Sequence, residues 1–449
     1  MGMLGQGVRW RWQAARRVSG SCRTGAAPVR AGITVSLLAV ALTASALALT
    51  ASVATGATAA NGWQSRAVVA PPGAARNPEA QLDGIACPKA TACVAGGYYQ
   101  NSAGALLPMI ATESHGRWRA IRLTLPASAG RSQQGAVSDV ACWAVGSCIA
   151  VGQYDTATTV GPGFVATESK GSWGEATDLP LPANAAASPQ AQFYSAACPS
   201  AGSCVTVGSY DNSAGSSLAV VVTESHGRWR EAQEIKLPAN STAAPEAQLI
   251  GVACRAAGSC AAVGSYEPRT GPDRGMEVIE SDGTWHRGTA VLPPADAEPK
   301  LGSYLTGVSC WSSSCVGVGG YSAASGATRP MAVSYHNGRW HTAVALRGVP
   351  RGAGAQPLAQ IDWVACTADG CTGVGEYTGG SARIVPVAVS ESGGRWKRAV
   401  PVTLPAGHGT GSEFQGFLHA VACAGRTCTA VGFFVHTGFR VLAMASTYR

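Results

Sequence analysis

Residues 249–266 read LIGVACRAAGSCAAVGSY, and six close copies of this stretch recur along the chain. The first cysteines of the seven copies are spaced 55 to 57 residues apart, at Cys87, Cys142, Cys198, Cys254, Cys310, Cys366 and Cys423. A tryptophan series runs in phase with them, at Trp63, Trp118, Trp173, Trp229, Trp285, Trp340 and Trp396. Such constant spacing indicates that one supersecondary unit has been duplicated and that neighbouring copies bury each other's faces.

Each period contains four short apolar runs separated by turn residues, which predicts four strands and no helix. In the first unit these runs are 82–87, 93–98, 109–113 and 118–123. The first run is apolar five and two residues before its cysteine, at Leu82 and Ile85. These positions have opposite parity along a strand, so we expect sheets packed on both faces of it, as adjacent blades of a propeller provide.

The two ends of the repeat series distinguish a closed ring from a string of separate hairpin modules. Trp63 precedes the first cysteine pair without strands of its own, and the last unit stops at 447–449, where its tryptophan strand should begin. Seven whole units result only if the strand that begins at Trp63 completes the last unit, which also removes an exposed sheet edge. The sequence therefore predicts an all-β fold: one seven-bladed β-propeller over residues 61–449, with four antiparallel strands per blade. Separate hairpin modules, the alternative, leave Trp63 unexplained.

Residues 1–60 differ in kind from the repeats. They contain six arginines and no acidic residue, followed by an uncharged apolar run over 33–54 and then Ala57-Thr58-Ala59. This order predicts a signal peptide for secretion. The apolar run is also long enough to span a bilayer, so a single uncleaved N-terminal membrane anchor is the alternative. In both cases we expect the propeller outside the cytoplasm, either secreted or tethered to the outer side of the cell membrane.

Fourteen of the 15 cysteines form seven pairs, each with four or five residues between its members. Cysteines on either side of a tight antiparallel turn can reach each other, so we expect one disulfide per blade: Cys87–Cys93, Cys142–Cys148, Cys198–Cys204, Cys254–Cys260, Cys310–Cys315, Cys366–Cys371 and Cys423–Cys428. Zinc is the competing interpretation, but it needs four ligands at one point, and no histidine stands at a constant offset from the pairs. We expect no metal and no cofactor.

The net charge of +8 comes mostly from the N-terminal segment. Without its six arginines, 27 basic and 25 acidic residues remain. No basic run with interleaved aromatic residues is present, so the sequence gives no reason to expect nucleic-acid binding. We expect a monomer whose partner is a glycan, a cell-envelope component or a protein.

The loops of a propeller are divided between its two faces. The turn inside each cysteine pair and the turn before each tryptophan are short and repeated, and we expect them on one face. The other face, which we call the variable face, receives the loops after each second strand and the loops between blades, which differ among units. Because a unique site must lie where the repeats differ, the recurring glutamates and tyrosines are assigned to the scaffold: Glu113, Glu168, Glu224, Glu280 and Glu391, and Tyr154, Tyr210, Tyr266, Tyr321 and Tyr377.

The charged residues of the variable face are the candidate ligand-binding residues. They are Arg131, Arg269, Asp273, Arg274, Arg329, Arg351, Arg383, His408 and His436, from a wider set that includes Asp155, Asp211 and Glu277. Such a mixed set can line a pocket for an anionic or sugar ligand at the mouth of the ring. A solvated rim is the alternative. No residue is assigned a catalytic role.

The turn Ser281-Asp282-Gly283-Thr284-Trp285 and its relatives resemble the Asp-box turn of sialidase-type propellers. That pattern has an aspartate two residues before the glycine and one more residue before the aromatic, and this chain lacks both. The resemblance implies the propeller and its strand phase but not sialidase activity. From Leu82 onward the chain also resembles the secreted Val-x-Cys and Ala-Val-Gly repeat proteins of high-GC Gram-positive bacteria, which implies an exported repeat fold and no particular activity.

Three functions remain open at this point. The first is an exported, non-catalytic binding or scaffold propeller that engages its ligand through the variable face. The second is a glycan-active hydrolase or lyase, which predicts two carboxylates from different blades roughly 5 to 10 Å apart. The third is a purely structural envelope protein, which predicts no pocket at all.

Overall fold

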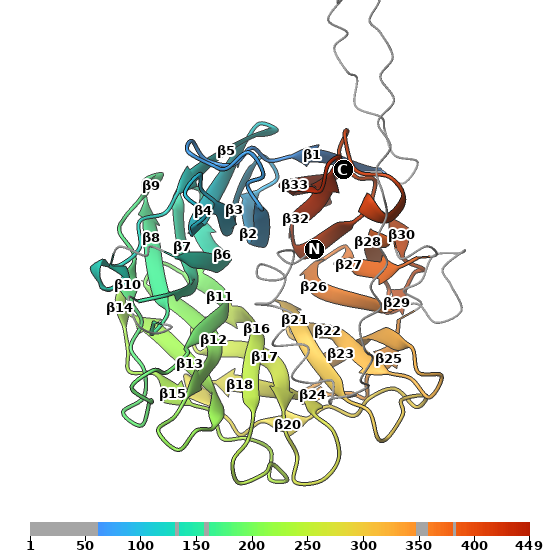
Figure 1. Ribbon diagram of the computed structural model, residues 1–449. Coiled ribbons are helices and arrows are strands. Elements are labelled where there is room, and N and C mark those ends of the chain that lie inside the picture. Colours follow the sequence, from blue (N-terminus) through green and yellow to red (C-terminus); the bar gives the residue numbers. More distant parts are fainter. Residues whose placement is uncertain (1–61, 131–133, 157–160, 347–357, 380–382) are drawn as a thin grey trace, which may run out of the picture.

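The computed structural model describes residues 62–130, 134–156, 161–346, 358–379 and 383–449. Over these ranges the chain forms a ring of seven antiparallel sheets, the blades, around a common centre (Figure 1). The predicted signal peptide or anchor, residues 1–60, lies outside the described residues. Among the described residues, no helix has the length and apolar character needed to cross a membrane.

The strands of each blade follow one another from the centre of the ring outward (Figure 1). Blade 1 contains β2 (Gln81–Lys89), β3 (Ala92–Gln100), β4 (Leu106–Ser114) and β5 (Arg117–Arg122). Blade 2 contains β6 (Gly135–Ala144), β7 (Ser147–Tyr154), β8 (Phe164–Ser169), β9 (Ser172–Trp173) and β10 (Thr177–Asp178). Blade 3 contains β11 (Gln192–Ser200), β12 (Ser203–Asp211), β13 (Ser217–Ser225), β14 (Arg228–Trp229) and β15 (Gln233–Glu234). Blade 4 contains β16 (Ala247–Ala256), β17 (Ser259–Tyr266), β18 (Arg274–Ser281), β19 (Thr284–Trp285) and β20 (Thr289–Ala290).

The remaining blades repeat this plan. Blade 5 contains β21 (Ser303–Trp311), β22 (Ser314–Ser322), β23 (Thr328–His336), β24 (Arg339–Trp340) and β25 (Val344–Ala345). Blade 6 contains β26 (Ala359–Thr367), β27 (Gly370–Thr378), β28 (Ile384–Ser392), β29 (Arg395–Trp396) and β30 (Val400–Pro401). Blade 7 contains β31 (Gly416–Ala424), β32 (Thr427–His436), β33 (Arg440–Tyr448) and β1 (Trp63–Ala67). In blades 2 to 6 the fourth strand is divided into two short pieces, and both pieces pair with the third strand.

The N-terminal strand closes the ring as predicted. Strand β1 pairs antiparallel with β33, so that Trp63 lies opposite Tyr448 and Ala67 lies opposite Met444. Trp63 is only 3% exposed, and its ring centroid is 5.6 Å from that of Tyr448. The innermost strands of blades 1 and 7, β2 and β31, also lie side by side. The seven-bladed propeller is confirmed, and separate hairpin modules are excluded.

The inner strand of every blade carries one extra residue, which the sequence patterns did not reveal. In blade 1, Leu82 pairs with Gly97 and Gly84 pairs with Gly96, so Asp83 is the extra residue of a β-bulge. The bulge shifts the alternation of side chains by one position, and Leu82 and Ile85 therefore lie on the same face of the sheet. From the sequence, we attributed the opposite parity of these two positions to packing on both faces of the strand. That explanation was wrong, because the bulge accounts for it. The seven bulge residues are Asp83, Ser138, Tyr194, Ile250, Thr306, Asp362 and His419.

The bulge explains the glycine of the repeated Val-Gly step. This glycine lies on the second strand, directly opposite the residue that precedes the bulge. A Cβ atom on Gly264 would be 1.9 Å from the carbonyl oxygen of Gln248, and one on Gly319 would be 2.1 Å from that of Tyr304. Both distances are far below van der Waals contact, so only glycine fits there.

The tyrosine after the Val-Gly step belongs to the scaffold, as predicted. Tyr154, Tyr210, Tyr266 and Tyr321 are all fully buried. Each phenol hydroxyl is within hydrogen-bonding distance of a side chain of the preceding interblade segment, as in Tyr210 to Asn184 Oδ1 at 2.8 Å. Tyr321 donates to Asp296 Oδ1 at 2.8 Å, and burial together with Asp296 raises the pKa of this tyrosine to about 12. The repeated tyrosines therefore fasten the interblade segments to the blades.

All seven predicted disulfides are present, one per blade, with Cα–Cα distances of 4.0 to 4.2 Å. The turn in each cysteine pair lies beside the hairpin turn of the same blade, because Gly283 N donates to Gly258 O at 3.0 Å and Gly227 N donates to Gly202 O at 3.4 Å. Both kinds of turn therefore lie on one face, which we call the disulfide face. Seven disulfides are typical of a protein that matures in an oxidising compartment.

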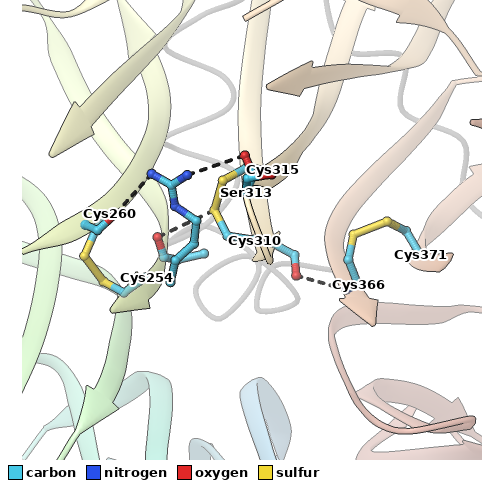
Figure 2. Close-up of a disulfide and its surroundings, with 11 residues drawn as sticks. Cys254, Cys260, Cys310, Ser313, Cys315, Cys366 and Cys371 are labelled. Atoms are coloured by element: carbon cyan, nitrogen blue, oxygen red, sulfur yellow. Dashed lines mark hydrogen bonds between the residues drawn. A yellow bond between two sulfur atoms is a disulfide. The ribbon is translucent and has the colours of Figure 1, made fainter. Parts of the chain in front are cut away.

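Neighbouring disulfide turns are joined from blade to blade (Figure 2). The guanidinium of Arg255 in blade 4 donates to Ser259 Oγ at 3.0 Å and to the carbonyl oxygen of Ser313 in blade 5 at 3.4 Å. One blade further, the amide of Cys366 donates to Ser309 Oγ at 2.9 Å. These contacts tie the disulfide face together without any covalent bond between blades.

Removing β1 is expected to open the ring. A chain that begins at Val69 leaves the edge of β33 unpaired and exposes the apolar surface that Trp63 covers. A chain that begins at Gly62 is the matched control, since it lacks only the N-terminal segment. We expect the shorter chain to unfold at a much lower temperature and to form oligomers in size-exclusion chromatography. Equal stability of the two chains would contradict closure by β1.

Removing one disulfide is expected to cost little. Each bond closes a loop of about seven residues, so replacing Cys254 and Cys260 with alanine should lower the free energy of unfolding by about 2 kcal/mol. Removing Cys87 and Cys93 as well, in a blade that does not touch blade 4, should add a similar loss. Thermal unfolding measures both effects. A thiol titration of the exported, denatured wild type should find no free thiol among the fourteen paired cysteines, and free thiols would contradict the pairing.

Candidate functional site

In blades 2 to 6, two positions of each inner strand are half-buried although their neighbours are buried, and we infer that these side chains face the centre of the ring. The aligned residues of blades 1 and 7 are buried, except for the half-buried His419. In blade 4, Gln248 and Ile250 are half-buried, whereas Leu249 and Gly251 next to them are buried between blades, and blades 2 to 6 share this alternation. The bulge permits this arrangement because it bends the inner strand and changes the direction in which the side chains at these positions point. We call these positions the axial ring. Its outer layer, six residues before the cysteine, is Gln81, Ala136, Gln192, Gln248, Tyr304, Gln360 and Phe417, and its inner layer is the seven bulge residues.

The outer layer of the axial ring lies at the variable face. Each inner strand runs from its interblade loop toward its disulfide turn, as β2 does from Gln81 to Lys89. The residue six positions before the cysteine is thus near the variable-face end of the strand. The ring mouth proposed from the sequence is therefore lined by residues of the inner strands, and not only by loops.

A buried pair of polar side chains joins blades 7 and 1 in this ring. Asp83 Oδ1 accepts hydrogen bonds from Gln81 Nε2 at 3.0 Å and from His419 Nδ1 at 2.9 Å. Phe417 and Phe433 stack with their centroids 4.6 Å apart, and the ring of Phe433 is 5.5 Å from that of His419. A carboxylate and an imidazole from different blades are thus held against an aromatic wall.

A second hydrogen-bonded group joins blades 5 and 6. The hydroxyl of Tyr304 donates to Gln360 Oε1 at 3.1 Å, and Gln360 Nε2 donates to Glu376 Oε1 at 2.6 Å. Burial, and then the negative charges of Asp362 and Glu376, raise the pKa of Tyr304 well above its ordinary value. The Tyr304 hydroxyl therefore keeps its proton and its role as a hydrogen-bond donor at all physiological pH values.

The axial ring is rich in amides, aromatic rings and hydroxyls. In blade 3, Tyr194 donates to Gln192 Oε1 at 2.6 Å. The ionisable members of the axial ring include the acids Asp83 and Asp362 and the imidazole of His419, and none of the fourteen residues is arginine or lysine. This composition provides donors and acceptors for hydroxyl groups and flat apolar surfaces. It provides no arginine or lysine side chain to bind a carboxylate.

The axial ring could have been found in the sequence. The position four residues before the cysteine holds six different residue types in seven copies, although it lies inside the most regular part of the repeat. Attention to loops alone missed it, because the run as a whole reads as scaffold.

Three of the four candidate arginines among the described residues hold loops of the variable face in place. Arg269 donates to the carbonyl oxygens of Ser241 at 3.2 Å and Ala239 at 3.4 Å. Arg274 donates to the carbonyl oxygen of Pro299 at 3.1 Å. Arg329 forms an ion pair with Asp296 at 2.7 Å, in which both side chains are 45% exposed. Arg131 and Arg351 lie outside the described residues.

Asp273 lies in the loop between β17 and β18 and is partly buried. Burial, followed by the neighbouring carboxylates Glu267 and Glu246, raises its pKa to about 6. Asp273 therefore belongs to a group of three neighbouring carboxyls in blade 4, together with Glu246 and Glu267, and it lies in the same loop as Arg269.

The structure brings three of the candidates together at blades 6 and 7. The guanidinium carbon of Arg383 is 5.5 Å from the ring centroid of Phe414. The ring of His408 meets that of Phe414 edge-on at 5.2 Å, and His408 forms a backbone bridge with His436. We call these four residues the Phe414 cluster. Phe414 follows the short 3₁₀ helix η3 (Gly411–Glu413), and the only sequence signal for it is an aromatic residue inside a polar interblade loop.

Glu277 does not lie on the variable face, contrary to its place in the wider candidate set. It is in the middle of β18, opposite Val263, and its side chain is 6% exposed on the side of blade 4 that packs against blade 5. Its Oε2 atom has no hydrogen-bond partner among the described residues. Burial raises the pKa of this carboxyl to about 8. The aligned positions of blades 2 and 3 hold Val165 and Val221.

Several solved propeller structures are similar to this chain. An α-L-arabinanase from Penicillium chrysogenum is 12% identical, with a TM-score of 0.44, over 85% of this chain and 97% of the enzyme. The sialidase of Trypanosoma rangeli is 10% identical, with a TM-score of 0.41, over 83% of this chain and 55% of that protein. The fucose-specific lectin of Aleuria aurantia is 12% identical, with a TM-score of 0.40, over 73% of this chain and 98% of the lectin. At these values the similarity does not extend to a site or an activity.

No protein-family model matches the sequence, and no curated protein matches it.

Replacing Glu277 with valine is expected to stabilise the protein, most strongly at alkaline pH. The folded state keeps the carboxyl proton up to about pH 8, whereas the unfolded state releases it near the ordinary value of 4.5. The stability of the wild type should therefore fall as the pH rises through this window. We expect the melting temperature of the variant to exceed that of the wild type by a few degrees at pH 9 and by less at pH 5.

The reverse substitution supplies the control. Val165→Glu places a carboxyl at the aligned position of blade 2, and it should lower the melting temperature with the same pH dependence. A pH-independent effect of both substitutions would show that Glu277 acts through packing alone.

Proposed function

We propose that this protein is an exported, non-catalytic binding propeller that takes a glycan or another hydroxyl-rich component of the cell envelope at the axial ring. Export is supported by the basic and apolar N-terminal segment together with the seven disulfides. The observation that carries the proposal is the axial ring itself, in which an outer layer rich in glutamine lies at the variable face, next to an inner layer whose residues differ among the repeats.

The chemistry of the axial ring favours a neutral, hydroxyl-bearing ligand over an anionic one. Glutamine offers a donor and an acceptor side by side, which suits neighbouring hydroxyl groups. Tyr194 and Tyr304 add aromatic faces, against which the C–H side of a sugar ring can pack. The acids Asp83 and Asp362 would repel an anion, and Arg269, Arg274 and Arg329 are already engaged by loop carbonyls or by Asp296.

The Phe414 cluster extends this binding surface toward the rim. Phe414 and His408 are half-buried, and Arg383 is exposed beside them. A ligand longer than one sugar could contact the axial ring and this cluster together, which would make binding depend on both.

The test is a glycan and cell-wall-fragment array probed with residues 62–449. For a ligand that binds, Tyr194→Ala and Asp362→Ala should each weaken binding by about tenfold, because each removes a buried contact. Arg383→Ala and His408→Ala should weaken binding of longer ligands only. Arg426→Ala, on an exposed turn of the disulfide face, is the control and should change nothing.

The results also show where the proposal would fail. Ligand binding that survives all axial-ring and Phe414-cluster substitutions would remove the variable face as the binding site. A strong preference for anionic glycans would contradict the chemistry assigned to the axial ring.

A glycan-active hydrolase is the second candidate, and one observation favours it. Asp83 and Asp362 occupy the same repeat position in blades 1 and 6, and Asp83 is hydrogen-bonded to His419. A hydrolase would release reducing ends from a bound glycan, and Asp83→Asn would abolish this release while keeping the ligand bound. Binding without release in the wild type would support the non-catalytic function.

A further inference from the structure

A separate pocket lies between blades 3 and 4, toward the disulfide face. Its volume is about 450 Å³. One side is formed by β12 and β13 of blade 3, and the other by the disulfide turn and the hairpin turn of blade 4. This pocket has no part in the function proposed above, since the axial ring opens at the opposite face.

Two buried polar atoms in the lining lack hydrogen-bond partners. Glu280 is 2% exposed, and its Oε2 atom is without a partner in the part of the chain that the structure describes. The same is true of the indole Nε1–H of Trp285, which pairs with Glu280 across the hairpin. Trp285 is buried, whereas the equivalent tryptophans of blades 2, 3, 5 and 6, such as Trp229 and Trp340, are half-buried. Glu280 occupies a repeated scaffold position, and the aligned pair of blade 2, Glu168 and Trp173, has the same two unpartnered atoms. The difference is that Trp173 is half-buried, whereas Trp285 is buried and lines this pocket together with Glu280.

The charge of the lining favours a cation. Three glutamates, Glu224, Glu231 and Glu280, contribute to it, against one basic side chain, Arg230. Glu224 is partly satisfied, because its Oε2 accepts from the amide of Cys204 at 3.2 Å. The rest of the wall includes Ser203, Thr223 and Gln233, which can hydrogen-bond to ligand hydroxyls.

We propose that this pocket binds an amino sugar with a free ammonium group. Glu280 accepts hydrogen bonds from the ammonium, and the indole N–H of Trp285 donates to an oxygen on the neighbouring carbon. The hydroxyl and amide side chains of blade 3 receive the remaining sugar hydroxyls. The volume accommodates one or two sugar rings, and the negative lining holds the charge.

The experiment is isothermal titration calorimetry of residues 62–449 with glucosamine, at a pH at which its amine is protonated. N-Acetylglucosamine is the neutral matched ligand, and glycinamide carries an ammonium beside a carbonyl but has no sugar ring. We expect glucosamine to bind at least about tenfold more tightly than either control ligand. Equal binding of N-acetylglucosamine would overturn the role of the ammonium, and equal binding of glycinamide would overturn the sugar.

Variants then locate the site. Glu280→Gln should weaken glucosamine binding by about tenfold or more, and Trp285→Phe, which keeps an aromatic ring but loses the N–H, should weaken it by a few fold. Glu267→Gln removes the same charge on the variable face and should leave binding unchanged. Thermal unfolding of all three variants separates a loss of binding from a loss of fold. Wild-type affinity in both pocket variants would overturn the proposal.

Proton release gives an independent readout. Burial raises the pKa of Glu280, and a bound ammonium should lower it again. At mildly acidic pH, binding should therefore expel a proton, and the measured enthalpy should depend on the ionisation enthalpy of the buffer. This dependence should vanish in Glu280→Gln. A buffer dependence that persists in this variant would assign the proton to another group and overturn the role of Glu280.

Discussion

The extra residue in each inner strand is the constraint on which the rest of the structure depends. It leaves no room for a side chain on the opposite strand, and this is why a glycine recurs at that position in every unit. It also separates two sets of side chains on a single strand. Residues such as Leu249 pack between blades, while Gln248 and Ile250 face the centre. One irregularity therefore provides both the packing of the ring and its functional lining.

Ring closure and the disulfides stabilise different parts of the molecule. Each disulfide joins two adjacent strands of one blade, so it restricts only a short loop and cannot hold the ends of the chain together. The pairing of β1 with β33 links the first and last strands of the fold. Blade-to-blade contacts such as Arg255 to Ser313 complete the assembly on the disulfide face. The fold therefore relies on hydrogen bonds and burial between blades and on covalent bonds only within them.

The architecture could be predicted from the sequence because it follows from period and phase. The seven cysteine pairs and the tryptophan series gave the number of blades, the closure at Trp63 and the division into two faces. The site could not be predicted in the same way. Phe414, His408 and Arg383 are near one another only because the loop before β31 folds over blade 6, and Glu277 looks like a loop residue until the start of β18 is known.

The bulge shows the limit of such patterns most clearly. The pattern of apolar residues along a strand shows which positions are buried. A β-bulge shifts this pattern by one residue, and the shifted pattern looks the same as that of a strand buried on both faces. Only the pairing register, Leu82 with Gly97 and Gly84 with Gly96, distinguishes the two. The axial ring was missed for a different reason, because its residues lie in the most regular part of the repeat and were assigned to the scaffold.

The pairing of β1 with β33 determines how residues 62–449 would be displayed by an attachment next to these two strands. Trp63 and Tyr448 pair with each other at the disulfide-face end of the outermost strands of blade 7. A support joined directly before Trp63 or after Tyr448 would therefore hold the disulfide face toward itself and leave the variable face pointing outward. Immobilisation through a terminal tag would keep the axial ring accessible to large ligands in solution, while the pocket beside Trp285 would be reached only from the attached side.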